Sequence, residues 1–192
     1  MNQLRAFVAI EISQDIQQAI QARTHDFQQS NSQSVRWVPA ENIHLTLKFL
    51  GDISSSQLDI IKRTLIGEAG RHGAFELSIG RLGAYPTPRR PRVIWVGVDA
   101  PAALKTLQHN IDNALERLSF EKENKPFSPH LTLGRVNQHA SMQDLQRIST
   151  ALEKTSLPVL GTMHVTHITV FKSDLRPSGA VYTSLFNIPL AT

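Results

Sequence analysis

The chain carries one tetrapeptide twice, as His44-Leu45-Thr46-Leu47 and as His130-Leu131-Thr132-Leu133. Each copy ends near a glycine, Gly51 in the first case and Gly134 in the second, and is followed by an amphipathic helix pattern that opens at a serine. The two copies start about 86 residues apart in a chain of 192 residues. This repetition favours a duplicated unit made of two halves.

Each tetrapeptide is predicted to lie on a β-strand, because apolar and polar residues alternate in it. Residues two apart in a strand point to the same face, so His44 and Thr46 share one face and the leucines share the other. The same holds for His130 and Thr132. If the halves are related by a pseudo-twofold axis, the two His–Thr pairs face each other across a cleft.

Two opposed histidines suit phosphodiester chemistry. A neutral imidazole accepts a proton from the nucleophile, and a protonated imidazole donates one to the leaving oxygen. The ordinary pKa of histidine lets both protonation states coexist near neutral pH. The hydroxyls of Thr46 and Thr132 can hold the non-bridging phosphate oxygens. We therefore expect His44 and His130 to be catalytic, with no metal and no cofactor required.

The rest of the chain predicts a mixed α+β protein with mainly antiparallel sheet, because helices and strands alternate while several strands follow each other directly. Four helices are expected, with caps at Ser13, Ser54, Asp99 and Ser141, and with Pro101 in the first turn of the third. A proline-rich stretch, 86–91, is expected to be a loop. Strands are expected at 4–12, 36–38, 43–50, 75–82, 93–98, 131–136, 163–172 and 181–188.

Composition excludes several classes of protein. Apolar residues make up 41% and charged residues 19% of the chain, which is typical of a globular protein. The absence of cysteine excludes disulfide scaffolds, cysteine-ligated metal centres and thiol catalysis. No apolar run approaches the length of a membrane span, and the first residues lack a signal-peptide pattern. We expect a cytoplasmic protein that is a monomer.

The motifs resemble a known family. HLTLKFLG at residues 44–51 and SPHLTLGR at residues 128–135 resemble the paired signatures of the 2H phosphoesterase superfamily. Within it they are similar to the bacterial and archaeal RNA 2′,3′-cyclic phosphodiesterases, also named 2′-5′ RNA ligases. The resemblance implies a bilobal α+β fold, with two antiparallel sheets, helices outside and a central cleft. Residues 1–192 would then form one domain of two lobes, each contributing one motif.

The resemblance also implies an activity, the hydrolysis of an RNA 2′,3′-cyclic phosphate end to a 2′-phosphate. By analogy with the family, His130 is the base that activates water and His44 is the acid that protonates the departing O3′. Thr46 and Thr132 hold the phosphate. The expected partner is RNA with a 2′,3′-cyclic phosphate end, or a related nucleotide, and not a membrane.

Two further residues match family positions. Arg135 resembles an arginine that contacts phosphate, and Phe49 resembles an aromatic residue that stacks on the terminal base. Strict alternation turns both away from their histidines, so they reach the cleft only if the strands end or bulge at Gly134 and after Lys48.

A basic cluster, Arg89, Arg90 and Arg92, lies in a predicted loop that enters a strand. The chain has a net charge of +4, which permits an anionic partner. The cluster is a candidate guide for the RNA backbone, because phosphate contacts position nucleic acids. A solvated loop is the alternative interpretation.

Other readings of the motifs remain open. Two more His-x-Thr sequences, starting at His164 and His167, are expected on one strand as structural or exposed residues. The motif chemistry also allows 2′-5′ ligation of RNA in the same cleft, or a non-catalytic module that binds RNA ends or nucleotides. A metal site built by His44 and His130 is disfavoured, because neither motif contains a carboxylate and threonine is a poor metal ligand.

Overall fold

The structure, a computed structural model, describes residues 3–176 and 179–191. In this part of the chain the α-helices are α1 (Gln14–Ser30), α2 (Ser55–Ala69), α3 (Ala102–Glu116) and α4 (Met142–Lys154), with a short 3₁₀ turn η1 (Ala40–Asn42). The strands are β1 (Gln3–Glu11), β2 (Val35–Trp37), β3 (His44–Ser54), β4 (Phe75–Thr87), β5 (Arg90–Asp99), β6 (His130–Val136), β7 (Gly161–Val165), β8 (His167–Arg176) and β9 (Gly179–Pro189).

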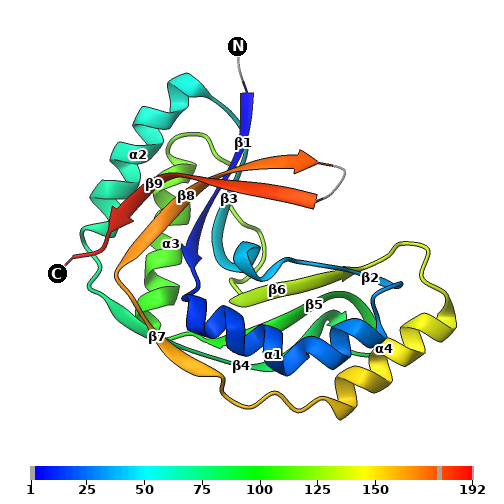
Figure 1. Ribbon diagram of the computed structural model, residues 1–192. Helices are drawn as coiled ribbons and strands as arrows, with labels where there is room; N and C mark the ends of the chain where they lie inside the picture. Colours follow the sequence, from blue (N-terminus) through cyan, green and yellow to red (C-terminus); the bar gives the residue numbers. More distant parts are fainter. Residues whose placement is uncertain (1–2, 177–178, 192) are drawn as a thin grey trace.

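The strands form a curled antiparallel sheet in the order β7-β4-β5-β6-β3-β1-β8-β9, with β2 paired to β6 (Figure 1). The two motif strands, β3 and β6, meet at its centre through the residue pair Leu45–Leu131. On one side of this junction lie β5, β4 and β7, and on the other lie β1, β8 and β9. The expected α+β architecture is confirmed, and the two expected sheets are joined into one through this junction.

The sheet curls far enough for its two sides to meet at one end. A single residue, Thr166, separates β7 from β8, although β7 pairs with β4 and β8 pairs with β1 on the opposite side of the sheet. The predicted strand 163–172 is therefore wrong, because its two parts belong to different halves. At the other end the halves diverge, with the β8–β9 hairpin facing β6 and β2 across an open space in the ribbon (Figure 1).

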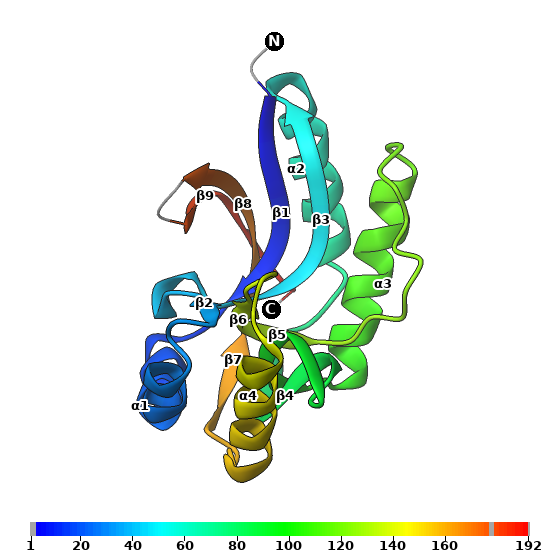
Figure 2. The same ribbon diagram turned by 90° about the vertical axis from the view of Figure 1, so that its right-hand side faces the viewer.

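The helices cover the outside of the curled sheet. One pair, α2 and α3, pack on each other and on β3, whereas α1 and α4 flank the half that holds β4 to β7 (Figure 2). Their apolar faces are buried, and so are all four motif leucines, Leu45, Leu47, Leu131 and Leu133. No helix of the described ranges is long and apolar enough to span a lipid bilayer.

Local signals explain two helix starts. The backbone N–H of Ser54 donates to the side chain of Gln57 at 2.9 Å, as the predicted capping box requires. Ser141 makes the same type of box with Asp144, whose backbone N–H donates to the serine hydroxyl at 3.1 Å. The predicted loop 86–91 is wrong at both ends, because β4 and β5 extend through it and leave only a tight hairpin turn.

Candidate active site

The two motifs lie next to each other on the concave face of the sheet. Continuing the Leu45–Leu131 register by one residue in each direction sets His44 across from Thr132, and Thr46 across from His130. The four side chains are partly exposed, while the leucines between them are buried. The sheet therefore brings together the histidine of each half and the threonine of the other half.

Each histidine ring is held in the same way. The Nδ1 atom of His44 lies 2.8 Å from the carbonyl oxygen of Asn42, and Nδ1 of His130 lies 2.8 Å from the carbonyl oxygen of Ser128. A carbonyl oxygen only accepts hydrogen bonds, so Nδ1 carries the proton in both rings. The Nε2 atoms are left to accept a proton when the ring is neutral, or to donate one when it is charged.

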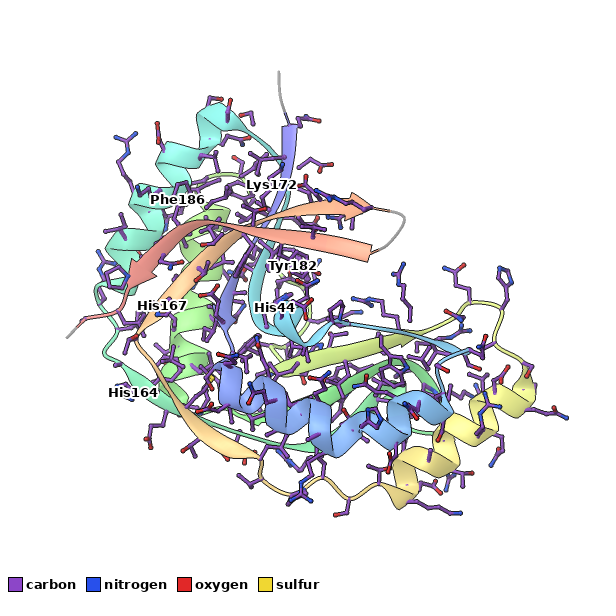
Figure 3. All side chains as sticks on the ribbon, in the orientation of Figure 1. His44, His164, His167, Lys172, Tyr182 and Phe186 are labelled. Atoms are coloured by element: carbon purple, nitrogen blue, oxygen red, sulfur yellow. The ribbon has the colours of Figure 1, made fainter. Side chains whose placement is uncertain are left out.

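Each histidine also meets the ring of a tyrosine almost at a right angle. The ring centroids of His44 and Tyr182 are 5.2 Å apart at 86°, and those of His130 and Tyr85 are 5.1 Å apart at 81°. Figure 3 shows His44 beside Tyr182, beneath the β8–β9 hairpin. The hydroxyl of Tyr85 lies 2.7 Å from the hydroxyl of Ser128, the residue whose carbonyl holds His130.

One side of the His44 ring packs against aromatic residues, and Glu11 on β1 is its cross-strand partner. Its ring stacks on Phe7, with 4.7 Å between ring centroids, and the ring of Phe171 lies 5.3 Å from that of Phe7 and 6.3 Å from that of His44. Burial lowers the pKa of His44, and the hydrogen bond to Asn42 opposes this shift. Burial raises the pKa of Tyr182, while the charges of three arginines act in the opposite direction, with Arg135 first among them. His44 is thus neutral more readily than an ordinary histidine.

Both motif strands bulge at their second leucine. On β3 the pairing with β1 passes from Thr46 to Lys48, and on β6 the pairing with β5 passes from Thr132 to Gly134. One extra residue reverses the alternation, so the residue after next returns to the cleft face. The bulges that the sequence required are present, one residue earlier than expected, and they bring Phe49 and Arg135 to this face as exposed side chains.

The residue after each bulge is buried, and its role differs between the two halves. Lys48 is fully buried; its Nζ lies 2.5 Å from Oδ1 of Asp112 on α3 and also donates to the carbonyl of Glu121. Gly134 lies under Trp37, and a Cβ there would come within 2.7 Å of the indole ring. In the first half this position anchors the segment that follows α3.

Three cavities surround the junction of the halves. The largest, about 610 Å³, is lined on one side by Thr46, Phe49 and His130, and on the other by Tyr85, Pro86, Arg92 and Phe127, among others. A second, about 480 Å³, is lined by Arg36, Arg92, Val93, Arg135, Val136, Asn137 and Gln138. A third, about 360 Å³, includes His44, Asn42, Phe171 and Tyr182. Thr46 and His130 line the first of these cavities, Arg135 lines the second and His44 lines the third, whereas Thr132 lines none of the three.

The other candidate histidines lie elsewhere. His164 is exposed on β7, and His167 on β8 lies 3.5 Å from a carboxylate oxygen of Glu11. They occupy two strands rather than one, and Figure 3 shows both apart from His44. No group of three or more histidines, aspartates and glutamates that could hold a metal ion occurs among the described residues.

The sequence did not predict several residues of this site. Tyr182, Tyr85 and Phe7 are far from the motifs in the chain and belong to no recognisable pattern, whereas Arg36 lies eight residues before His44. Arg36 alone offered a signal, as a charged residue between Val35 and Trp37 at the start of the predicted strand 36–38, and this signal is weak.

Comparison with known proteins agrees with the internal duplication. The family model described as LigT-like phosphoesterase matches residues 10–95 and again residues 96–182, so each match contains one copy of the tetrapeptide. An RNA 2′,3′-cyclic phosphodiesterase of Methanothermobacter thermautotrophicus is 31% identical over 182 residues, covering 95% of this chain and 96% of the relative. One from Archaeoglobus fulgidus is 31% identical over 183 residues, covering 95% and 98%.

Solved structures of similar proteins have the same fold. Escherichia coli LigT complexed with NADP+ has a TM-score of 0.75 and 27% identity, with both chains covered in full. The same protein complexed with 3′-AMP has a TM-score of 0.74 and 25% identity, again with full coverage. The match of both halves to one family model, together with relatives above 30% identity, confirms the resemblance to the 2H phosphoesterases, and the chain belongs to the LigT-like phosphoesterase family.

Proposed function

We propose that this phosphoesterase hydrolyses the 2′,3′-cyclic phosphate at an RNA end to a 2′-phosphate, with His44 and His130 as its acid–base pair. The observation that carries the proposal is that both rings are held in the same way, each by Nδ1 on a backbone carbonyl oxygen, which leaves Nε2 available for proton transfer. A threonine of the other half occupies the register position across from each histidine. The relatives named RNA 2′,3′-cyclic phosphodiesterase support the choice of substrate.

The cyclic phosphate is placed between the two His–Thr pairs. Hydroxyl donors on rigid strands at Thr46 and Thr132 hold the non-bridging oxygens, where negative charge develops in the transition state. Arg135 adds a positive charge from the cleft face. The terminal base enters the 610 Å³ cavity and stacks on the exposed ring of Phe49, since every base has a π-face.

In the reaction step, water attacks the phosphorus atom and gives its proton to Nε2 of His130. The bond between phosphorus and O3′ breaks, and Nε2 of His44 protonates O3′. The products are a 2′-phosphomonoester and a free 3′-hydroxyl. His130 is then charged and His44 neutral, and proton exchange with water restores the starting state.

The burial of His44 couples its protonation to substrate binding. Its lowered pKa favours the neutral ring in the free protein. A bound phosphate anion favours the charged imidazole, because an opposite charge nearby raises the pKa of histidine. His44 is therefore protonated, and able to act as the acid, when the substrate is bound.

The first test is to incubate the protein in EDTA with RNA that ends in a 2′,3′-cyclic phosphate and to identify the product. A 2′-phosphate is expected, and His44→Ala and His130→Ala each lower the rate about 10²–10⁴-fold. His164→Ala, the control, keeps the rate. A 3′-phosphate, or full dependence on a metal ion, contradicts the proposal, and joined RNA after addition of a 5′-hydroxyl strand identifies ligation instead.

A second substrate separates the two roles. In a cyclic phosphate with sulfur at the 3′ position, the leaving thiolate needs no proton. If His44 is the acid, His44→Ala regains most of its rate with this substrate and His130→Ala does not. The opposite pattern would reverse the assignment.

A further inference from the structure

Three arginines converge beside the candidate active site. Arg36 on β2 and Arg135 on β6 are direct cross-strand partners, and Arg92 on β5 lies at an irregularity in the pairing with β4. All three side chains are exposed, and they line the 480 Å³ cavity together with the amides of Asn137 and Gln138. We name this cavity the arginine pocket.

The charges of the arginine pocket are uncompensated. No carboxylate lines the cavity. None of the ion pairs among residues 3–176 and 179–191 involves its three arginines. Like charges directly opposite each other in an antiparallel pair are destabilising. An anion bound between Arg36 and Arg135 would offset this repulsion.

The arginine pocket is continuous with the cavity proposed for the terminal nucleoside. Arg92 and Val93 line both spaces. Val93 is paired with Arg135 in the sheet, so the row Val93, Arg135 and Arg36 leads from the larger cavity across β6 to β2. An RNA strand that leaves the 610 Å³ cavity past Arg92 therefore enters the arginine pocket.

We propose that the arginine pocket binds the phosphodiester that links the terminal nucleotide to the one before it, so that the protein selects RNA ends over cyclic mononucleotides. This inference rests on the proposed function. Guanidinium groups suit the task, because they bind phosphate oxygens in a bidentate manner. The cluster predicted from the sequence, Arg89, Arg90 and Arg92, contributes only Arg92, since Arg89 in the hairpin turn and Arg90 at the start of β5 do not line this cavity.

The test compares two substrates that share the reacting group. One is 2′,3′-cyclic AMP, which has only the reacting phosphate, and the other is a trinucleotide with a 2′,3′-cyclic phosphate end. Arg36→Gln and Arg92→Gln should each lower kcat/KM for the trinucleotide about 10-fold more than for the mononucleotide, the size of a charge-assisted hydrogen bond. The salt dependence of trinucleotide binding should become shallower by about 0.7 in log–log slope.

Two control variants make the same change in net charge. Arg63→Gln lies on α2 outside the sheet, and Arg89→Gln lies at the β4–β5 turn. Both should keep the wild-type ratio of the two kcat/KM values. If Arg89→Gln changes the ratio as much as Arg36→Gln, the effect is diffuse attraction and the proposed subsite is wrong. Equal losses on both substrates in Arg36→Gln also overturn it.

The result separates this inference from the proposed function. If the wild-type protein opens neither substrate, the proposed function fails. Binding of the trinucleotide 2′-phosphate is then compared with binding of adenosine 2′-phosphate by calorimetry. A loss of affinity in Arg36→Gln that is confined to the trinucleotide supports the pocket independently of turnover, and no such loss overturns it.

Discussion

Leu45 and Leu131, the second residues of the two motifs, form the residue pair that joins β3 to β6 at the centre of the sheet. Both side chains are fully buried, and the halves of the sheet diverge from this point. The pair sets the register between the motifs, and thus decides which threonine faces which histidine. One apolar contact therefore links the stability of the junction to the geometry of the candidate active site.

Shortening one of these leucines should affect both properties. Leu131→Ala removes buried methyl groups and leaves a cavity, so the free energy of unfolding should fall by about 2–5 kcal/mol in urea denaturation. Phosphodiesterase activity of the folded variant should fall as well, because the register of His130 and Thr46 relaxes. Leu175→Ala, at a leucine that is 70% exposed, is the control and should lose little of either. Full activity in a destabilised Leu131→Ala variant would show that this leucine pair does not control the geometry of the catalytic residues.

The partial burial of His44 makes the stability of the fold depend on pH. Because burial lowers the pKa of His44, the unfolded chain binds a proton more readily than the folded protein. The contribution is fully present above the ordinary value of 6.5. It is lost as the pH falls from there through the lowered pKa of the folded state.

Replacing His44 should remove this part of the pH dependence. Between pH 7.5 and pH 5.5, the free energy of unfolding should fall less in His44→Gln than in the wild type, as measured by urea denaturation at each pH. An equal fall in the two proteins would show that the burial of His44 does not disfavour its charged form.

The rate of hydrolysis should also depend on pH, with a bell-shaped profile of kcat/KM. One histidine must be neutral and the other protonated, so the rate falls on both sides of an optimum. The residual activity of His44→Ala should lose the limb that His44 contributes, and that of His130→Ala should lose the other. A profile that stays flat from pH 5 to pH 8, with chemistry limiting the rate, would contradict the two-histidine mechanism.

Breaking the buried ion pair of Lys48 and Asp112 should lower stability, because the remaining charge is left buried without its partner. Lys48→Met leaves the carboxylate of Asp112 buried without its cation, so we expect a loss of about 3–5 kcal/mol in the free energy of unfolding. The double variant Lys48→Met/Asp112→Leu should lose less, because it leaves no buried charge. Lys122→Met breaks an exposed pair with Glu116 and should cost at most about 1 kcal/mol.

The sequence predicted the local features of the site and missed those that depend on tertiary structure. Alternation within each motif placed His44 and His130 on one face and the leucines in the core, and it also indicated that bulges are needed for Phe49 and Arg135. These are properties of single strands. The ion pair from Lys48 to Asp112 joins residues 64 positions apart, which no local pattern can show.

The path of the chain was harder to predict for the same reason. The predicted strand 163–172 is uniformly suited to a β-strand, yet it crosses between the two sides of the sheet at Thr166. Whether a strand continues or changes partner depends on the curl of the whole sheet. Tyr182 on β9 and Tyr85 on β4 contact their histidines from strands that do not pair with the motif strands, so no local pattern predicts these contacts.

The arginine pocket also predicts how an anion changes thermal stability. In the free protein, Arg36 faces the like charge of Arg135, so Arg36→Gln should leave the melting temperature equal or higher. Inorganic phosphate, which binds the folded state, should raise the melting temperature of the wild type more than that of Arg36→Gln. Differential scanning fluorimetry over a phosphate titration, at constant ionic strength set with chloride, measures both effects. If Arg36→Gln melts lower than the wild type without phosphate, Arg36 stabilises the sheet itself, and the strain that we assign to the paired charges is absent.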